Sequence, residues 1–141
     1  MCMADQPEPK VRKSEKEWRA ILTEHQFLVT REGQTEPEFE GTYWDFFEVG
    51  VYHCVCCLVP LFSSETKFPA TSGWPSFWQP ISADRIYLHQ MQPGDDPQVT
   101  CRRCGAHLGH AHNDGPPPTG MRYSVNSAAL RFVPENVPNG T

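Results

Sequence analysis

The stretch CRRCGAHLGHAHNDGPPPTGMRYSVNSAALRF, residues 101–132, determines how this chain is organised. It contains a Cys-x-x-Cys pair, three histidines, a Gly/Pro turn cluster at residues 115–120 and a polar Ser-Val-Asn-Ser segment. A strand-like tail follows at residues 130–133. A metal anchor, imidazole groups and polar side chains therefore stand close together in the sequence. We expect the rest of the chain to complete the metal site and to form the walls of a pocket.

The Cys-x-x-Cys pair of this stretch has a counterpart earlier in the chain. Cys54 and Cys57 have the same spacing as Cys101 and Cys104. Zn²⁺ binds four thiolates tetrahedrally, and a two-residue spacer lets both sulfur atoms of a pair reach one ion. The two pairs therefore predict a zinc site with four protein ligands, which makes the metal structural and not catalytic. Two unrelated redox pairs or buried free thiols are the alternative.

The chain has six cysteines, so two lie outside these pairs. Cys56 has no partner at the required spacing, and we interpret it as a bystander that could compete for the metal. Cys2 stands in the polar start of the chain.

Length, charge and hydropathy exclude several classes of protein. A chain of 141 residues fits one domain of ordinary size. The net charge of −5 argues against nucleic-acid binding, and two short basic patches, residues 10–16 and 102–103, are interpreted as solvated surface. No apolar run is long enough to cross a membrane. The start MCMADQPEPK lacks the apolar core of a secretory signal, so we expect a cytoplasmic protein with reduced cysteines.

The chain divides into one domain and two short ends. We expect a disordered lead-in over residues 1–13, a single domain over residues 14–134 and a flexible tail over residues 135–141.

A capping-box pattern marks the start of the domain. Ser14 is followed three residues later by Glu17, which predicts a short helix over residues 15–24. The apolar residues of that helix recur at helical spacing, so one face should pack on the domain. These residues are Trp18, Ile21 and Leu22.

The rest of the domain favours antiparallel strands. The segments with strand-like patterns are residues 51–62, which run into the first Cys-x-x-Cys pair, and residues 85–92, 98–100 and 130–133. We expect no helix beyond the N-terminal third, and parallel strands would need more helical crossovers. The predicted fold is mainly β, with antiparallel sheets, a short N-terminal helix and a structural zinc. Residues 26–50 carry turn signals and aromatic residues, for which a binding surface, core packing and a lid are open alternatives.

Histidines and a polar segment form a candidate pocket. His107 and His110 follow the second Cys-x-x-Cys pair, and we interpret them as donors aimed at a polar ligand atom. Partly exposed structural histidines, and a second metal site without an obvious further ligand, are the alternatives. His112 is interpreted as a surface residue. Ser124 and Asn126 stand two apart and should share one face of an extended segment.

Arg122 should lie on the same face as Ser124. A Ser-His nucleophile pair is a possible interpretation of these residues. However, the sequence has no glycine elbow of the kind found in hydrolases, which weakens it.

Several motifs in order resemble the methionine-R-sulfoxide reductases of the MsrB type. The motifs are FEGTY at 39–43, Cys54 with Cys57, LFSSETKF at 61–68, GWPSF at 73–77, CRRCGAHLGH at 101–110, DGPPPTG at 114–120 and RYSVNSAALRF at 122–132. The resemblance covers residues 14–134. It implies reduction of the R epimer of methionine sulfoxide, free or in proteins, as part of protein repair under oxidative stress. It also implies a mainly antiparallel β fold with a structural zinc.

The resemblance also implies roles for single residues. Cys54, Cys57, Cys101 and Cys104 would hold the zinc. Trp74 would receive the methyl group of the substrate, with Arg122 and Asp114 as supports. His107, His110 and Asn126 would surround the sulfoxide oxygen, where imidazolium and amide donors stabilise developing negative charge. A thiolate attacks the sulfur and becomes a sulfenic acid, and thioredoxin or a similar dithiol completes the cycle.

Two positions depart from the family pattern. The nucleophilic cysteine of the family falls at Ser124, and a hydroxyl that is not ionised near neutral pH forms neither a sulfenic acid nor a disulfide. We therefore expect this chain to be inactive in turnover. An engineered Cys→Ser change, which the intact surrounding motifs favour, and a natural pseudo-enzyme are the two explanations. Some members have a second, resolving cysteine, which converts the sulfenic acid to a disulfide. In this chain that position is Ser72, which leaves Cys2, Cys56 or an external thiol for the role.

Overall fold

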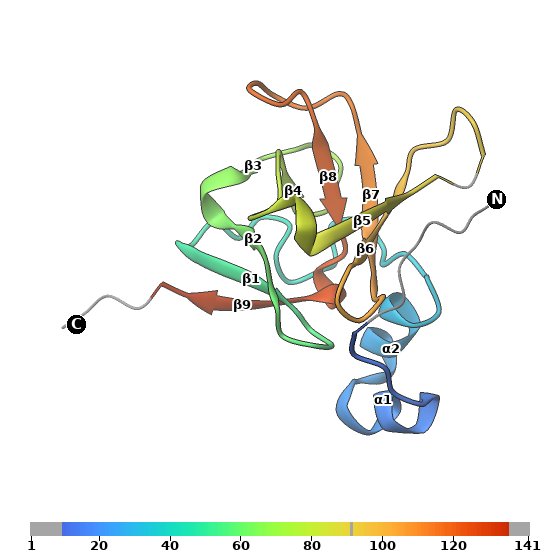
Figure 1. Ribbon diagram of the computed structural model, residues 1–141. Coiled ribbons are helices and arrows are strands. Elements are labelled where there is room, and N and C mark those ends of the chain that lie inside the picture. Colours follow the sequence, from blue (N-terminus) through green and yellow to red (C-terminus); the bar gives the residue numbers. More distant parts are fainter. Residues whose placement is uncertain (1–9, 91, 136–141) are drawn as a thin grey trace.

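The computed structural model describes residues 10–90 and 92–135, which form two antiparallel sheets (Figure 1). The strands are β1 (Gly50–Cys54), β2 (Pro60–Ser63), β3 (Lys67–Phe68), β4 (Ser76–Phe77), β5 (Ile86–His89), β6 (Gln98–Cys101), β7 (His107–His112), β8 (Arg122–Val125) and β9 (Leu130–Pro134). One sheet has the order β2-β1-β9, and the other has the order β3-β4-β8-β7-β6-β5. The prediction of a mainly antiparallel β fold is confirmed.

Two helices precede the sheets. Helix α1 spans Glu15–Ile21 and helix α2 spans Glu24–Thr30. The predicted capping box is present, because the Ser14 hydroxyl accepts from the backbone N–H of Glu17, whose carboxylate accepts from the Ser14 N–H. The described residues contain no helix that is long and apolar enough to span a membrane.

The single helix predicted over residues 15–24 is wrong in extent, and α2 was missed. Leu22 adopts an extended conformation that ends α1, and Thr23 then starts α2 through a second capping box with Gln26. Each capping box satisfies backbone N–H groups that the start of a helix would otherwise leave unpaired. Beyond α2, the described helical segments are the short 3₁₀ turns Ser64–Thr66, Ala83–Arg85 and Ser127–Ala129.

The helices pack on the second Cys-x-x-Cys pair. Trp18 and Leu22 are buried as predicted, whereas Ile21 is 56% exposed, which corrects its expected packing. Ile21 is the last residue of α1, where the chain turns away. The guanidinium of Arg31 stacks 4.3 Å from the centre of the Trp18 ring and donates to the carbonyl of Cys104 at 2.9 Å. This arginine therefore joins the helices to the turn that contains the second pair.

Aromatic rings fill the space between the sheets. The rings of Phe62 and Phe77 stack with centroids 4.5 Å apart, and Tyr52 meets Phe77 edge-on at 5.2 Å. All three side chains are fully buried. Tyr43 packs against Tyr52 at 5.4 Å, so this residue of the aromatic segment 26–50 extends the core.

Strand pairing places the polar segment at the centre of the larger sheet. Ser124 on β8 lies opposite His110 on β7 and opposite Ser76 on β4. Gly109 allows this approach, because a Cβ atom there would lie 1.8 Å from the carbonyl oxygen of Ser124. The register of β7 and β8 therefore brings the histidine motif and the Ser-Val-Asn-Ser segment side by side.

Candidate functional site

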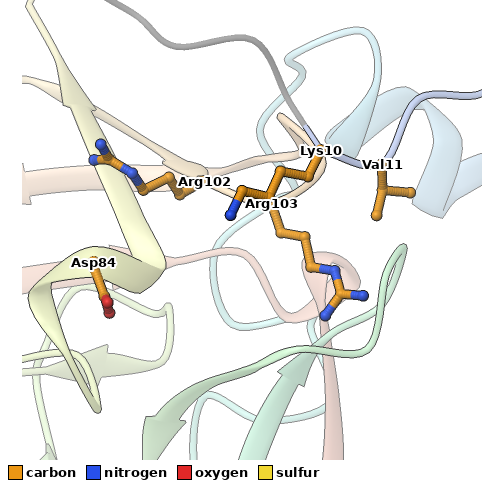
Figure 2. A pocket seen from close by; sticks show the side chains of 5 residues that line it. All are labelled: Lys10, Val11, Asp84, Arg102 and Arg103. Atoms are coloured by element: carbon orange, nitrogen blue, oxygen red, sulfur yellow. The ribbon is translucent and has the colours of Figure 1, made fainter.

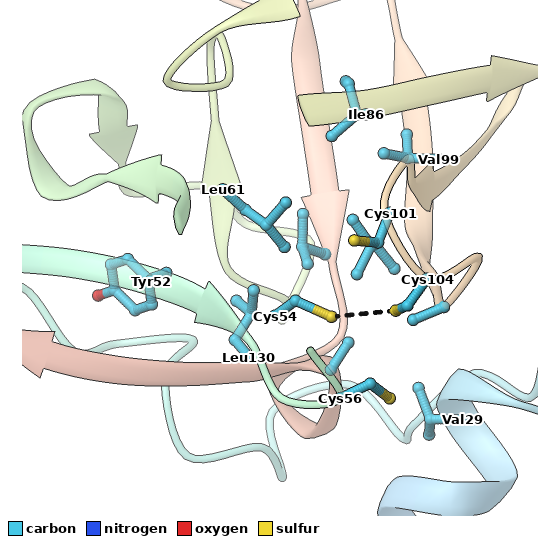
Figure 3. Packing of buried hydrophobic residues seen from close by; sticks show 14 of the residues in the cluster. Val29, Tyr52, Cys54, Cys56, Leu61, Ile86, Val99, Cys101, Cys104 and Leu130 are labelled. Atoms are coloured by element: carbon cyan, nitrogen blue, oxygen red, sulfur yellow. Dashed lines mark hydrogen bonds between the residues drawn. The ribbon is translucent and has the colours of Figure 1, made fainter. Parts of the chain in front are cut away.

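The four cysteines of the two pairs meet in one cluster. Their sulfur atoms all lie within 4.8 Å of one another, and the Cys54–Cys104 and Cys57–Cys101 separations are both 3.6 Å. Four sulfur atoms placed tetrahedrally about 2.3 Å from one zinc ion would be about 3.8 Å apart. The cluster therefore fits the size of a tetrahedral zinc site with four thiolates, of which Figure 3 labels Cys54, Cys101 and Cys104.

The two Cys-x-x-Cys turns have the same backbone geometry. In each turn the carbonyl of the first cysteine accepts at 2.8 Å from the residue after the second cysteine, namely Leu58 or Gly105. Both of these residues have positive φ, 68° for Leu58 and 80° for Gly105. The first turn follows β1 and the second follows β6, which belong to different sheets. A metal ion held by both turns would cross-link the two sheets.

Cys56 is buried but does not belong to this cluster. The group that could hold a metal comprises the four paired cysteines, and Figure 3 shows Cys56 beside Val29 of α2. This placement supports the interpretation of Cys56 as a bystander. Cys2 lies outside the described residues, as do most of the expected lead-in and tail.

A cavity of about 260 Å³ lies beside the pairing of β7 with β8. It brings together four of the expected pocket residues, Trp74, His110, Ser124 and Asn126. It is also lined by Thr35, Gly109 and His112. His107, Asp114 and Arg122 do not line it.

His107 lies behind His110. It is buried, its ring centre is 5.6 Å from that of His110, and its Nε2 has no hydrogen-bond partner among the described residues. Burial lowers the pKa of His107 to about 4 and also lowers the pKa of His110. Near neutral pH both rings are therefore neutral and each offers one N–H, whereas the sequence interpretation expected imidazolium donors.

His112, which the sequence analysis interpreted as a surface residue, is partly exposed and also lines the cavity. Its Nδ1 lies 2.8 Å from a carboxylate oxygen of Asp96. Side chains two apart on a strand point to the same side, so His112 follows His110 along β7. That spacing was the signal in the sequence that could have identified it.

Arg122 and Asp114 form a bidentate ion pair next to the cavity. The guanidinium donates to both carboxylate oxygens, at 2.9 and 3.2 Å. A hydrogen bond from Arg122 lowers the pKa of Asp114. Arg122 lies opposite His112 in the register of β7 and β8, so the pair braces this end of the hairpin.

Glu36 was missed by the sequence analysis. It is 2% exposed and its carboxylate accepts from the backbone N–H groups of Ser127 and Ala128, at 2.7 and 2.9 Å. Its own backbone N–H donates to the side-chain oxygen of Asn126, and its carbonyl accepts from the indole of Trp74. No pattern in the sequence distinguished this residue from the exposed glutamates around it.

A second hollow, of about 510 Å³, lies elsewhere on the surface (Figure 2). It is lined by Lys10, Val11, Asp84, Arg102 and Arg103. The two basic patches of the sequence therefore meet, and Val11 donates to the carbonyl of Arg103 at 2.8 Å. Their charged side chains are exposed, and none of the expected pocket residues lines this hollow, although Arg102 and Arg103 stand between the candidate metal ligands Cys101 and Cys104.

The buried His107 predicts a stability that decreases in acid. Its folded pKa of about 4 lies below the ordinary value of 6.5, so the unfolded chain binds more protons between these pH values. The free energy of unfolding should therefore fall by about 3 kcal/mol between pH 6.5 and pH 4. Urea unfolding of the unmutated protein and of His107→Gln, with zinc content measured at each pH, checks this. Identical pH profiles for the two proteins would contradict it.

The fold and these sites define a mainly antiparallel β protein with a four-cysteine centre and a separate polar pocket with an aromatic wall. The family model of the SelR domain matches residues 22–134 of this chain. A protein of Hahella chejuensis named peptide methionine sulfoxide reductase MsrB is 51% identical over 128 residues, which cover 87% of this chain and 90% of that protein. A protein of Methylibium petroleiphilum with the same name is 50% identical over 136 residues, covering 95% and 99%.

The chain therefore belongs to the SelR-domain family, and its similarity to methionine-R-sulfoxide reductases of the MsrB type is confirmed.

Proposed function

We propose that this protein binds methionine-R-sulfoxide and has the scaffold of the enzyme that reduces it, with serine in place of the nucleophile. The observation that carries the proposal is the cavity that places Trp74, His110 and Asn126 around Ser124. The names of the similar proteins state the same substrate group. A volume of about 260 Å³ suits one side chain, free or on a peptide, and not a large cofactor.

The proposed roles follow from what each group offers. Trp74 supplies an apolar wall for the methyl group and excludes water from one side of the pocket. His110 and Asn126 supply neutral N–H donors to the sulfoxide oxygen. His107 supports the ring of His110 from the buried side, which changes its expected role from direct donor to support.

The ion pair of Arg122 and Asp114 keeps a supporting role in the proposal, because it braces the β7–β8 hairpin that carries His110 and Ser124. It does so without lining the cavity.

The metal has a structural role in this proposal. Zinc would be held by Cys54, Cys57, Cys101 and Cys104, and its contribution is a cross-link between the two sheets. The thiolates, and not the pocket residues, would complete the coordination shell. The domain is proposed to extend over residues 14–134, while the expected ends and the cytoplasmic location stay predictions.

Two functions are compatible with this pocket, and the side chain at position 124 decides between them. A hydroxyl in the nucleophile's place supports binding without turnover, so a module that recognises methionine sulfoxide or a protein partner is the second candidate. If the family's cysteine belongs at this position, the chain is a reductase that a dithiol such as thioredoxin regenerates. Both candidates need the same pocket, and they differ in the chemistry of one side chain.

Binding of the two sulfoxide epimers tests the shared part of the proposal. We expect the unmutated protein to bind a short peptide with methionine-R-sulfoxide at least about tenfold more tightly than the S epimer, because a misplaced oxygen loses its donors. Isothermal titration measures both affinities, and a fluorescence change that disappears in Trp74→Phe locates the ligand. The Trp44→Phe variant is the matched control. Equal affinities for the two epimers would defeat the pocket assignment.

A further inference from the structure

Glu36 is the buried residue of an exposed segment. All its neighbours over residues 32–40 are exposed to solvent, whereas its own side chain is 2% exposed. A buried carboxylate is unfavourable unless hydrogen bonds compensate it, so a merely space-filling role would be better served by an apolar residue. The contacts of Glu36 therefore indicate what the buried charge is for.

The carboxylate anchors the segment on the turn that follows β8. Its two oxygens accept from the backbone N–H groups of Ser127 and Ala128, at 2.7 and 2.9 Å. These residues begin the 3₁₀ turn Ser127–Ala129, whose first N–H groups need acceptors. Gly41 leaves room for the carboxylate, because a Cβ atom there would lie 2.3 Å from Oε2.

The backbone of the same residue holds two pocket residues. The N–H of Glu36 donates to Oδ1 of Asn126 at 3.0 Å, and its carbonyl accepts from Nε1 of Trp74 at 2.9 Å. Nδ2 of Asn126 donates to the carbonyl of Leu108 at 3.0 Å. Together these bonds determine which end of the Asn126 amide is the donor, and they leave its second N–H for the pocket.

We propose that Glu36 is a positioning residue, whose carboxylate holds its backbone where it orients the Asn126 amide and the Trp74 ring toward the ligand. The inference rests on the proposed function, since it concerns the same pocket. Without the carboxylate of Glu36, the backbone N–H of this residue would no longer be held against Oδ1 of Asn126. That hydrogen bond keeps the amide oxygen turned away from the ligand. The pocket then loses part of its preference for one placement of a sulfoxide oxygen.

The Glu36→Gln variant tests the anchor with little change in size. A glutamine has one acceptor oxygen where the two backbone N–H groups need two, and its amide N–H₂ would face a donor. We expect the ratio of affinities for the R and S epimers to fall about tenfold, with zinc content and circular dichroism unchanged. Glu40→Gln, an exposed neighbour in the same segment, should keep the ratio of the unmutated protein.

Nuclear magnetic resonance supplies a readout that needs no ligand. The side-chain amide signals of Asn126 and the indole N–H of Trp74 should shift in Glu36→Gln and stay in place in Glu40→Gln. If the unmutated protein does not discriminate the epimers but these signals shift, the proposed function fails and the positioning role stands. If Glu36→Gln folds with unchanged signals and an unchanged epimer ratio, the positioning role is overturned.

A second variant covers the case in which Glu36→Gln does not fold. Glu36→Asp keeps the charge and both acceptor oxygens on a side chain one methylene shorter, so it should shift the same signals by less and retain part of the epimer ratio. In the unmutated protein, the Trp74 indole N–H should exchange with solvent at least about tenfold more slowly than in an unstructured peptide, because it donates to a buried carbonyl. Exchange as fast as in the peptide would remove the basis of the inference.

Discussion

Replacing Cys101 by serine should remove the metal from the protein and unfold most of the domain. Cys101 ends β6, and its sulfur atom lies 3.6 Å from that of Cys57 on the other sheet's turn. Structural zinc contributes roughly 10–16 kcal/mol of apparent free energy in small zinc domains, whereas whole domains are stable by only about 5–15 kcal/mol. Loss of even part of the zinc contribution is therefore comparable with the total stability.

The measurement combines metal analysis with circular dichroism and thermal unfolding. The unmutated protein should carry one zinc per chain, and Cys101→Ser should carry less than about a tenth of that amount with no cooperative transition. Cys56→Ser is the matched control, because Cys56 is a buried cysteine outside the group that could hold the metal. It should keep both zinc and fold. A metal-free Cys101→Ser protein with a native spectrum and cooperative unfolding would refute the structural role of the site.

Replacing Ser124 by cysteine should create methionine-R-sulfoxide reductase activity. The hydroxyl lies in the proposed pocket among His110, Asn126 and Trp74, so the change supplies the missing nucleophile without rebuilding the site. In a well-studied protease, removing the nucleophile costs on the order of a millionfold in kcat. The rate of the cysteine form should therefore exceed that of the serine form by far more than the error of an assay.

This change permits a reaction in two steps. The introduced thiolate attacks the sulfoxide sulfur, the oxygen takes up a proton from solvent, and the S–O bond of the substrate breaks as the oxygen passes to the cysteine sulfur, which yields methionine and a sulfenic acid. An external dithiol, such as dithiothreitol, then reduces the sulfenic acid to the thiol, releases water and becomes a disulfide. The N–H donors of the pocket stabilise the charge that develops on the oxygen.

The neutral histidines determine how the rate of the Ser124→Cys variant should depend on pH. Burial lowers the pKa of both His107 and His110, so neither of these two rings supplies an imidazolium near pH 7 to favour the thiolate. The rate of Ser124→Cys should therefore rise with pH toward the ordinary thiol pKa of about 8.5. Steady-state formation of methionine from the R epimer is the assay, with the S epimer and Ser124→Ala as controls. A folded, zinc-loaded Ser124→Cys protein that makes no methionine would leave the binding module as the function.

Local patterns in the sequence determined much of the fold. The equal spacing of Cys54 with Cys57 and of Cys101 with Cys104 predicted the cluster, because two intervening residues suffice to turn both sulfur atoms toward one point. Ser14 and Glu17 predicted the start of α1, because side chains three residues apart can form a capping box. Alternating and β-branched segments predicted the strands, and the lack of predicted crossover helices favoured an antiparallel arrangement. The pairs, the helix start and the strands were each predicted from residues within one turn or strand of one another.

The pocket required the tertiary structure. The packing of the larger sheet decides that the cavity forms beside His110 and His112 and that His107 is buried behind His110. Burial, which the sequence does not specify residue by residue, makes the histidines neutral. Glu36 acquires its role through hydrogen bonds to residues some ninety positions away. Spacing along the chain determines short-range geometry, whereas pairing register and exclusion of water arise only when distant segments pack together, and these decide the chemistry of the site.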